Sequence, residues 1–182
     1  MGKALLYSSE EPLVARHPIQ EDQIPAEIQR FEDALIKTRQ QILDIQKRLA
    51  DQLGQEHADI FDAHLLVLED HALRKELLTG LREQLVNIEA VFDDVIQRYL
   101  KAFRKTEDEY LRDRIADLHD VRKRLLRNLT GERSGFLTRL KEPVVVVAHD
   151  LSPSETAQMH KRNVLAFVTD IGGRTSHTAI MA

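Results

Sequence analysis

Hydrophobic positions in the first third of the chain recur at alternating spacings of three and four residues. They comprise, with one threonine among them, Ile28, Phe31, Leu35, Thr38, Ile42, Ile45 and Leu49. This spacing places the residues on one face of an α-helix that packs against another helix. We therefore expect a long helix from about residue 25, ended by Gly54.

Three further segments carry the same helical period. A second helix is expected over residues 55–70, and a shorter segment over residues 73–78 continues it after a bend. We call each such row of mainly apolar positions on one helix face a seam. The third seam comprises Leu81, Leu85, Ile88, Phe92, Val95, Tyr99 and Ala102. The fourth begins near residue 107 and comprises Leu111, Ile115, Leu118, Val121, Leu125 and Leu129. Short joints favour a four-helix bundle, and the alternative is an extended dimeric coiled coil, although no heptad run continues beyond one helix.

Both ends of the chain carry strand patterns instead. Residues 3–7 can form a short strand, residues 144–147 a buried strand, and residues 164–169 a third that is nearly all apolar or β-branched. Between the last two strands stands a capping box with proline at the first helical position, which comprises Ser152, Pro153, Ser154 and Glu155. The short helix that starts there carries Thr156. Strands that alternate with helices predict a mostly parallel sheet.

The order of these patterns predicts an α/β fold combined with an all-α insertion. Residues 1–20 and 141–182 are expected to form an α/β domain. Residues 25–130 are expected to form a helical domain inserted after the first strand. The prolines and glycines that mark the crossings between the two are Pro12, Pro18, Pro25, Gly131, Gly135 and Pro143.

Composition and net charge exclude several classes of protein. The chain has no cysteine, which excludes disulfides and thiolate metal sites. No apolar run approaches the roughly 20 residues that span a bilayer, and no signal-peptide core follows the first residues, so we expect a cytoplasmic protein without membrane contact. A net charge of −4 excludes a broad nucleic-acid surface and accommodates a basic partner more easily than an acidic one.

Residues 172–182 read GGRTSHTAIMA and place one histidine, His177, among glycines and hydroxyls at the expected start of a helix. Gly172 and Gly173 allow the backbone to approach a tetrahedral anion, and the N–H groups of a first helical turn hold phosphate oxygens. The neighbouring side chains that could assist are Arg174, Thr175 and Ser176. A strand followed by a glycine turn and a helix is typical of phosphate sites at the carboxyl edge of α/β sheets. Spacing alone leaves a tight turn with an exposed histidine as an equal alternative.

The sequences of four segments resemble a known family. GGRTSHTAIMA, together with LSPSETAQM at residues 151–159, resembles the phosphohistidine domain of Enzyme I, the phosphoenolpyruvate-protein phosphotransferase of the bacterial sugar phosphotransferase system. IFDAHLLVLED at residues 60–70 and DEYLRDRIADLHDVRKRLLRNLTG at residues 108–131 resemble the helices of that family that bind the carrier protein HPr. Pyruvate phosphate dikinase and phosphoenolpyruvate synthase carry similar histidine motifs, and the helical segments separate Enzyme I from them.

The resemblance implies a phosphoryl relay. His177 would accept phosphate from phosphoenolpyruvate and pass it to HPr. Thr156 would hold the Nδ1 side of the imidazole and leave Nε2 as the nucleophile, although an ordinary first-turn threonine is the alternative. Family members keep phosphoenolpyruvate and Mg²⁺ on a separate C-terminal barrel, so no cofactor is expected in this chain.

The resemblance also implies a docking face for HPr on the helical domain. Its residues match Glu56, His64, Leu66, Leu73 and Arg114, with Leu66 in place of a methionine. His64 could instead be a half-buried structural histidine, and Leu73 or Leu66 could belong to the core. A zinc site is disfavoured because the spacing of the histidines in this region is not a usual ligand spacing.

The ends of the chain depart from the family pattern. The sequence stops inside the helix that His177 should begin and lacks the strand that opens the family's sequence, so we expect a fragment with a truncated α/β domain. Two functions stay open: a phosphoryl relay, and an HPr-docking module that cannot hold phosphate. A nitrogen-related branch of Enzyme I also stays open.

Overall fold

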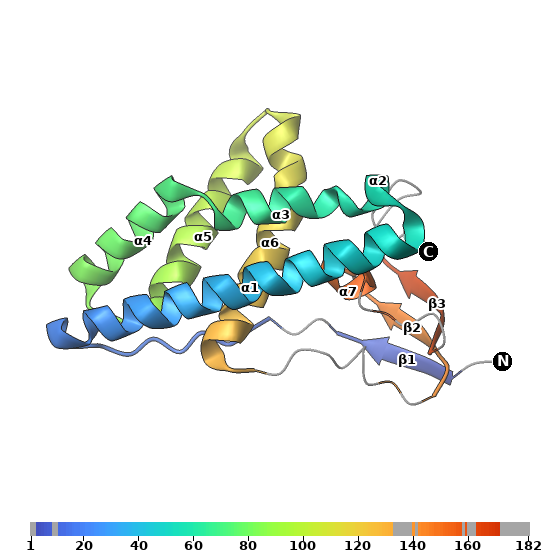
Figure 1. Ribbon diagram of the computed structural model, residues 1–182, viewed down its shortest axis with the longest axis horizontal. Helices are drawn as coiled ribbons and strands as arrows, with labels where there is room; N and C mark the ends of the chain where they lie inside the picture. Colours follow the sequence, from blue (N-terminus) through green and yellow to red (C-terminus); the bar gives the residue numbers. More distant parts are fainter. Residues whose placement is uncertain are drawn as a thin grey trace. The chain divides into compact units, whose positions relative to one another are not determined.

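The computed structural model describes residues 3–8, 11–132, 140, 142–157, 159 and 163–171, with the backbone alone for residues 109–113. These residues fall into two compact units (Figure 1). The helical unit comprises residues 12–44 and 59–132, and the sheet unit lies within residues 1–11, 45–58 and 133–182. The described part of the chain is thus mostly helical, with one small three-stranded sheet.

Two of the predicted helices are confirmed almost as expected. The bounds in the structure are η1 Glu21–Gln23, α1 Ile24–Leu53, α2 Gln55–Ala58, α3 Ile60–Leu68, α4 His71–Gln84, α5 Ile88–Lys105 and α6 Glu109–Thr130. The first and fourth seams correspond to α1 and α6, and α1 ends at Gly54, whose φ of 101° favours glycine. No helix in the described residues is long and apolar enough to cross a bilayer.

The single helix predicted from the third seam is wrong, because the seam crosses a break. Leu81 belongs to α4, Leu85 closes that helix in a left-handed conformation with a φ of 49°, and α5 begins only at Ile88. Residues 17–19 form backbone hydrogen bonds with the residues at this break. Ile19 donates its N–H to the Leu85 carbonyl at 2.8 Å. The apolar period continues across the break since α4 and α5 face the same core.

The predicted helix over residues 55–70 is likewise two helices, α2 and α3, with a turn at Asp59. Asp70 then caps α4, where its carboxylate accepts the N–H groups of Ala72 at 2.7 Å and Leu73 at 3.1 Å. The segment expected over residues 73–78 lies inside this longer helix. A capping aspartate therefore starts a new helix at the place where the sequence predicted only a bend.

The core of the helical unit combines side chains from α1, α4, α5 and α6. Phe31, Leu77, Phe92 and Leu125 are all buried there, with the rings of Phe31 and Phe92 centred 6.2 Å apart. Thr38 fits this apolar seam since its hydroxyl donates to the Ala34 carbonyl at 2.7 Å. One chain buries this core, whereas a dimeric coiled coil would bury it between two chains.

A buried polar cluster ties the start of α5 to the chain before α1. Asn87 donates to the Ala15 carbonyl at 2.9 Å and accepts the His17 N–H at 3.0 Å. Glu27 accepts the first N–H of α5, that of Ile88, at 2.8 Å. Arg30 pairs with Glu27 and with Glu89. Burial opposes the charge of Arg30, but the two glutamates outweigh it and raise the guanidinium pKa above its ordinary value.

The sheet unit contains three parallel strands in the order β1-β2-β3. Their bounds are β1 Lys3–Tyr7, β2 Val144–Ala148 and β3 Val164–Thr169, which confirms the predicted strands and their parallel direction. Leu5, Val146 and Phe167 stand in register on the face that forms a small core. β1 pairs directly with β2 in the sheet. In the sequence, helices α1 to α6 come between these two strands.

Tyr99 supplies a pH prediction for the helical unit. Its hydroxyl donates to Glu76 of α4 at 2.9 Å, and burial together with this bond raises the pKa of Tyr99 to about 12. Because the folded pKa lies above the ordinary value of about 10, the stabilisation is complete below about pH 10 and is lost as pH rises toward 12.

Titration of tyrosinate absorbance should therefore show one of the three tyrosines ionising late. Glu76→Gln should move that step back toward the ordinary value, and Glu83→Gln, which alters an exposed residue of the same helix, should leave it in place. An identical titration curve for Glu76→Gln and the unaltered chain would contradict this assignment.

Candidate functional site

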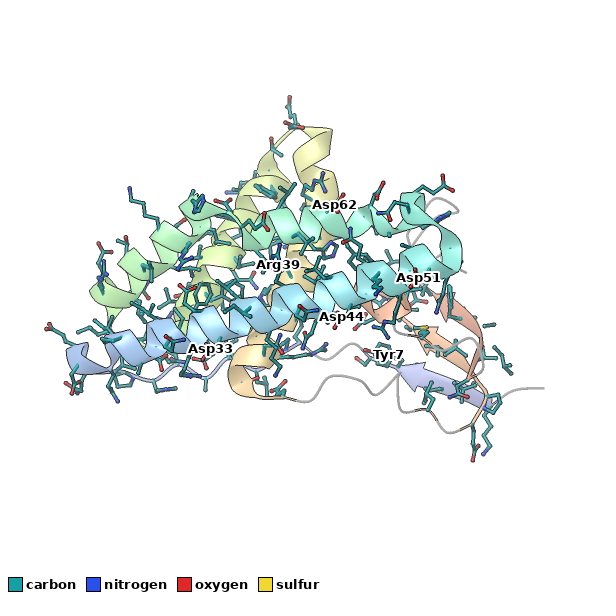
Figure 2. All side chains as sticks on the ribbon, in the orientation of Figure 1. Tyr7, Asp33, Arg39, Asp44, Asp51 and Asp62 are labelled. Carbon is teal, nitrogen blue, oxygen red and sulfur yellow. The ribbon has the colours of Figure 1, made fainter. Side chains whose placement is uncertain are left out.

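The candidate site lies at the carboxyl edge of the parallel sheet. Parallel strands end at the same edge, and polar side chains stand at or just after each strand end. Tyr7, which Figure 2 labels, ends β1, His149 follows β2 and Asp170 follows β3. This edge is where small anionic ligands bind in open α/β sheets.

The short helix α7, Pro153–Ala157, begins with the predicted capping box. The Ser152 N–H donates to the Glu155 carboxylate at 2.9 Å, and the Glu155 N–H donates to the Ser152 hydroxyl at 3.2 Å. The Tyr7 hydroxyl also donates to Glu155, at 2.9 Å. The end of β1 and the start of α7 are therefore fixed to each other through one carboxylate.

Thr156 is a buried residue of α7, with 7% of its surface exposed. Its hydroxyl donates to the Ser152 carbonyl at 3.0 Å, one turn earlier in the chain. Because the hydroxyl proton is used in this bond, the lone pairs of the oxygen are left to accept. Thr156 can thus receive a hydrogen bond from a neighbouring donor without giving up its own.

The chain that leaves β3 stays attached to the end of β2. Asp170 donates its N–H to the Ala148 carbonyl at 3.3 Å, and Ile171 donates to the His149 carbonyl at 3.0 Å. The exposed side chains of His149 and Asp170 lie 3.1 Å apart. The predicted phosphate residues follow directly but lie outside the described residues: Gly172, Gly173, Arg174, Thr175, Ser176 and His177.

The residues predicted to dock a partner differ in exposure. Leu66 is 63% exposed on α3, and Asp62 and Glu69 lie four residues before it and three after it, both exposed (Figure 2 labels Asp62). We call Asp62, Leu66 and Glu69 the acidic stripe. Glu56 of α2 is also exposed. Leu73 is buried in the core of the helical unit.

His64 is 1% exposed and bridges α3 to α6. Its Nε2 lies 3.2 Å from Asp120, and its Nδ1 lies 3.3 Å from the Ile60 carbonyl and 3.8 Å from Asp117. Arg114 donates to Asp117 at 3.2 Å. The structure therefore brings His64 and Arg114 together through Asp117, a contact that the sequence did not predict.

Comparison with known proteins identifies the family. Residues 1–114 match the description "PEP-utilising enzyme, N-terminal", and residues 140–182 match "PEP-utilising enzyme, mobile domain". The chain belongs to the family of PEP-utilising enzymes. It is 40% identical over its whole length to the phosphoenolpyruvate-protein phosphotransferase of Haemophilus influenzae and 41% identical over 98% of its length to that of Listeria innocua.

Solved structures agree with this family. A solution structure of Enzyme I superposes with a TM-score of 0.80 at 41% identity, covering 99% of this chain and 73% of the other. The N-terminal domain of "Enzyme 1 - Nitrogen" gives 0.71 at 25% identity, covering 98% and 73%. The resemblance to Enzyme I is confirmed.

The chain spans about a third of the length of the curated relatives it matches. The capping box predicted from the sequence is confirmed, and the role of Thr156 stays a prediction. Sequence reasoning did not name Tyr7, His149, Asp117 or Asp120. The parallel strand order gave a signal for the first two, since both stand where strands end. The two aspartates flank the apolar seam residues of α6, which is a weaker signal for buried polar partners.

Among the described residues, no group of three or more histidine, aspartate or glutamate side chains is placed to hold a metal ion. The ring of His64 has two aspartates of α6 as neighbours. The chemistry that this part of the family member offers is hydrogen bonding and charge, at the carboxyl edge of the sheet and on α3 and α6.

Proposed function

We propose that this chain is the phosphoryl-relay part of a phosphoenolpyruvate-protein phosphotransferase. His177 accepts a phosphoryl group and passes it to the carrier protein HPr in a sugar phosphotransferase system. The observation that carries the proposal is the hydroxyl of Thr156, which is arranged to accept a hydrogen bond. The family match over residues 140–182, which include His177, supports the same function.

The acceptor role of Thr156 selects one form of the His177 ring. An imidazole whose Nδ1–H donates to the threonine oxygen carries its lone pair on Nε2, which is then the nucleophile. Nε2 forms a bond to phosphorus as the bond between phosphorus and the donor's leaving oxygen or nitrogen breaks. In the reverse direction HPr is the acceptor. Gly172, Gly173, Arg174, Thr175 and Ser176 would bind the phosphate oxygens and neutralise their charge.

Phosphoenolpyruvate and Mg²⁺ would bind to a C-terminal domain of the complete enzyme, as the resemblance implies. The relatives are about three times as long as this chain, which leaves room for such a domain. We assign the phosphohistidine domain to residues 1–20 and 141–182 and the HPr-binding domain to residues 25–130. The chain would act in the cytosol, without nucleic-acid or membrane partners.

The acidic stripe supports a docking role for α3. Leu66 exposes an apolar side chain between two carboxylates, which suits a partner with an apolar contact in a basic surface. Arg114, about one third exposed on α6, extends the proposed face, and we include the exposed Glu56 of α2 as a further docking residue. His64 and Leu73 would act from beneath it, since both side chains are buried.

A docking module without phosphoryl transfer is the second candidate. The acidic stripe belongs to the helical unit, which is compact by itself, so docking does not require the residues around His177. The branch of the family is a separate question. The 41% identity to an Enzyme I structure against 25% to the nitrogen-related one supports the sugar branch.

Phosphoryl acceptance separates the two candidates. The purified chain, incubated with phosphorylated HPr, should acquire an acid-labile and base-stable phosphate, and His177→Ala should abolish it while leaving circular dichroism and HPr affinity nearly unchanged. His17→Ala, which alters an exposed histidine of the helical unit, is the matched control and should accept phosphate normally. Phosphoenolpyruvate with Mg²⁺ alone should not label the chain. Equal labelling of His177→Ala and the unaltered chain would remove the relay function.

Thr156 tests the proposed tautomer. Thr156→Val keeps the shape of the side chain but removes the acceptor, so the rate of phosphoryl acceptance should fall by about 10- to 100-fold. Thr156→Ser keeps a hydroxyl and should recover most of the rate. The comparison separates the role of the oxygen as a hydrogen-bond acceptor from the packing of the side chain. Single-turnover transfer from phosphorylated HPr gives both rates. If the valine and serine variants accepted the phosphoryl group equally fast, Thr156 would have no role in orienting the His177 ring.

Docking is tested on Leu66 and Glu56. Leu66→Ala should weaken HPr binding by about 1 to 2 kcal/mol without unfolding the chain, because the side chain is exposed. Glu56→Lys should slow association and flatten its salt dependence. Leu13→Ala, at another strongly exposed leucine, is the control and should leave affinity unchanged. Calorimetry and stopped-flow kinetics measure these effects, and unchanged binding in both variants would exclude this surface.

A further inference from the structure

The helix that carries Leu66 is short and interrupted on both sides. α3 has nine residues, follows a turn at Asp59 and ends two residues before Asp70, the cap of α4. A helix of this length is not held in place by its own continuity with neighbouring helices. Its orientation therefore depends on the side chains that it buries, which are Phe61, Ala63 and His64.

Both ring nitrogens of His64 face oxygen atoms that accept hydrogen bonds. Nε2 lies 3.2 Å from Oδ2 of Asp120, and Nδ1 lies 3.3 Å from the Ile60 carbonyl. Oδ1 of Asp117 is 3.8 Å from Nδ1. The ring of Phe61 packs beside the imidazole, with centroids 5.1 Å apart. The side chain thus lies between its own helix and two carboxylates of α6.

A neutral imidazole can donate a hydrogen bond at only one of these two nitrogens. It has one N–H, so either tautomer sets the lone pair of the other nitrogen against a carbonyl or carboxylate oxygen. An imidazolium donates at both nitrogens and places its positive charge beside two buried carboxylates. Arg114 adds a second cation at Asp117, 3.2 Å from the other carboxylate oxygen.

We propose that His64 is held as an imidazolium that bridges α3 to Asp117 and Asp120 of α6, and that this bridge positions the acidic stripe for its partner. The docking part of the inference rests on the proposed function. His64, Asp117 and Asp120 are positioning residues here, since none of them reaches the partner. If α3 is ordered in only a fraction of the molecules, the apparent affinity for the partner is reduced by that fraction.

The protonation state is read directly from the full-length chain labelled with ¹⁵N-histidine. Both ring nitrogens of His64 should show the chemical shifts of protonated nitrogen near neutral pH. In Asp120→Asn the amide can donate to Nε2, so Nε2 should shift to the value of an unprotonated acceptor while Nδ1 stays protonated. Glu83→Gln, at an exposed site of α4, should change neither nitrogen. A neutral His64 ring in the unaltered chain would overturn the proposal.

HPr affinity and amide exchange in α3 test the positioning role. Asp120→Ala removes the nearer of the two carboxylates beside the His64 ring, so HPr affinity should fall by about tenfold and α3 amides should exchange faster. Asp120→Asn keeps a weaker bond and should lose less affinity, and it carries the test if the alanine variant fails to fold. Unchanged affinity in both, with Leu66→Ala still weakening binding, would refute the positioning role. If Leu66→Ala has no effect on HPr affinity either, the proposed docking surface is wrong. The chemical shifts of the His64 ring nitrogens then still test whether His64 forms the bridge as an imidazolium.

Discussion

The sheet unit depends on the parallel pairing of β1 with β2. The two strands are separated by residues 8–143, so their pairing is a non-local contact whose loop-closure entropy must be met by burial of Val144, Val146 and their neighbours. The same pairing places Tyr7 within reach of Glu155, since β1 then ends beside the start of α7. Without it, the strand end and the helix that carries Thr156 would have no fixed relation. The candidate site is therefore a consequence of strand order rather than of any single motif.

In the proposed relay, chemistry and recognition reside in different parts of the chain. At the carboxyl edge of the sheet, a buried threonine whose proton is already used can orient a donor. In the helical unit, an exposed leucine flanked by carboxylates stands on a helix held from below by a histidine and two aspartates. A relay needs both functions, because the phosphoryl group must be oriented on one residue and its carrier must be held long enough to deliver it.

Local patterns predicted much of the fold. The seams of α1 and α6, the three strands and the capping box at Ser152 could be predicted since each depends on neighbours in sequence. The break at Leu85 could not, because α4 and α5 bury the same side and keep the apolar period across the joint. What fixes that break is the contact of residues 17–19 with residues 85–87, which lie far away in the sequence.

The buried partners of His64 could not be predicted for a similar reason. Its partner Asp120 lies 56 positions later in the chain, and an isolated histidine on a helix gives no sign of which face it occupies. Thr156 was easier, since a first-turn position in a capping box restricts where its hydroxyl can point. The polar contacts within one helical turn were predictable, and those that join separate elements required the tertiary structure.

The central claim is that Nε2 of His177 carries the phosphoryl group while Nδ1 remains a donor to Thr156. The most direct measurement combines ¹⁵N-histidine and ³¹P NMR on the chain phosphorylated by phosphorylated HPr. We expect a single phosphohistidine at His177, with phosphorus coupled to Nε2 and Nδ1 still protonated. Phosphorus on Nδ1, or on another histidine such as the exposed His149, would contradict the account.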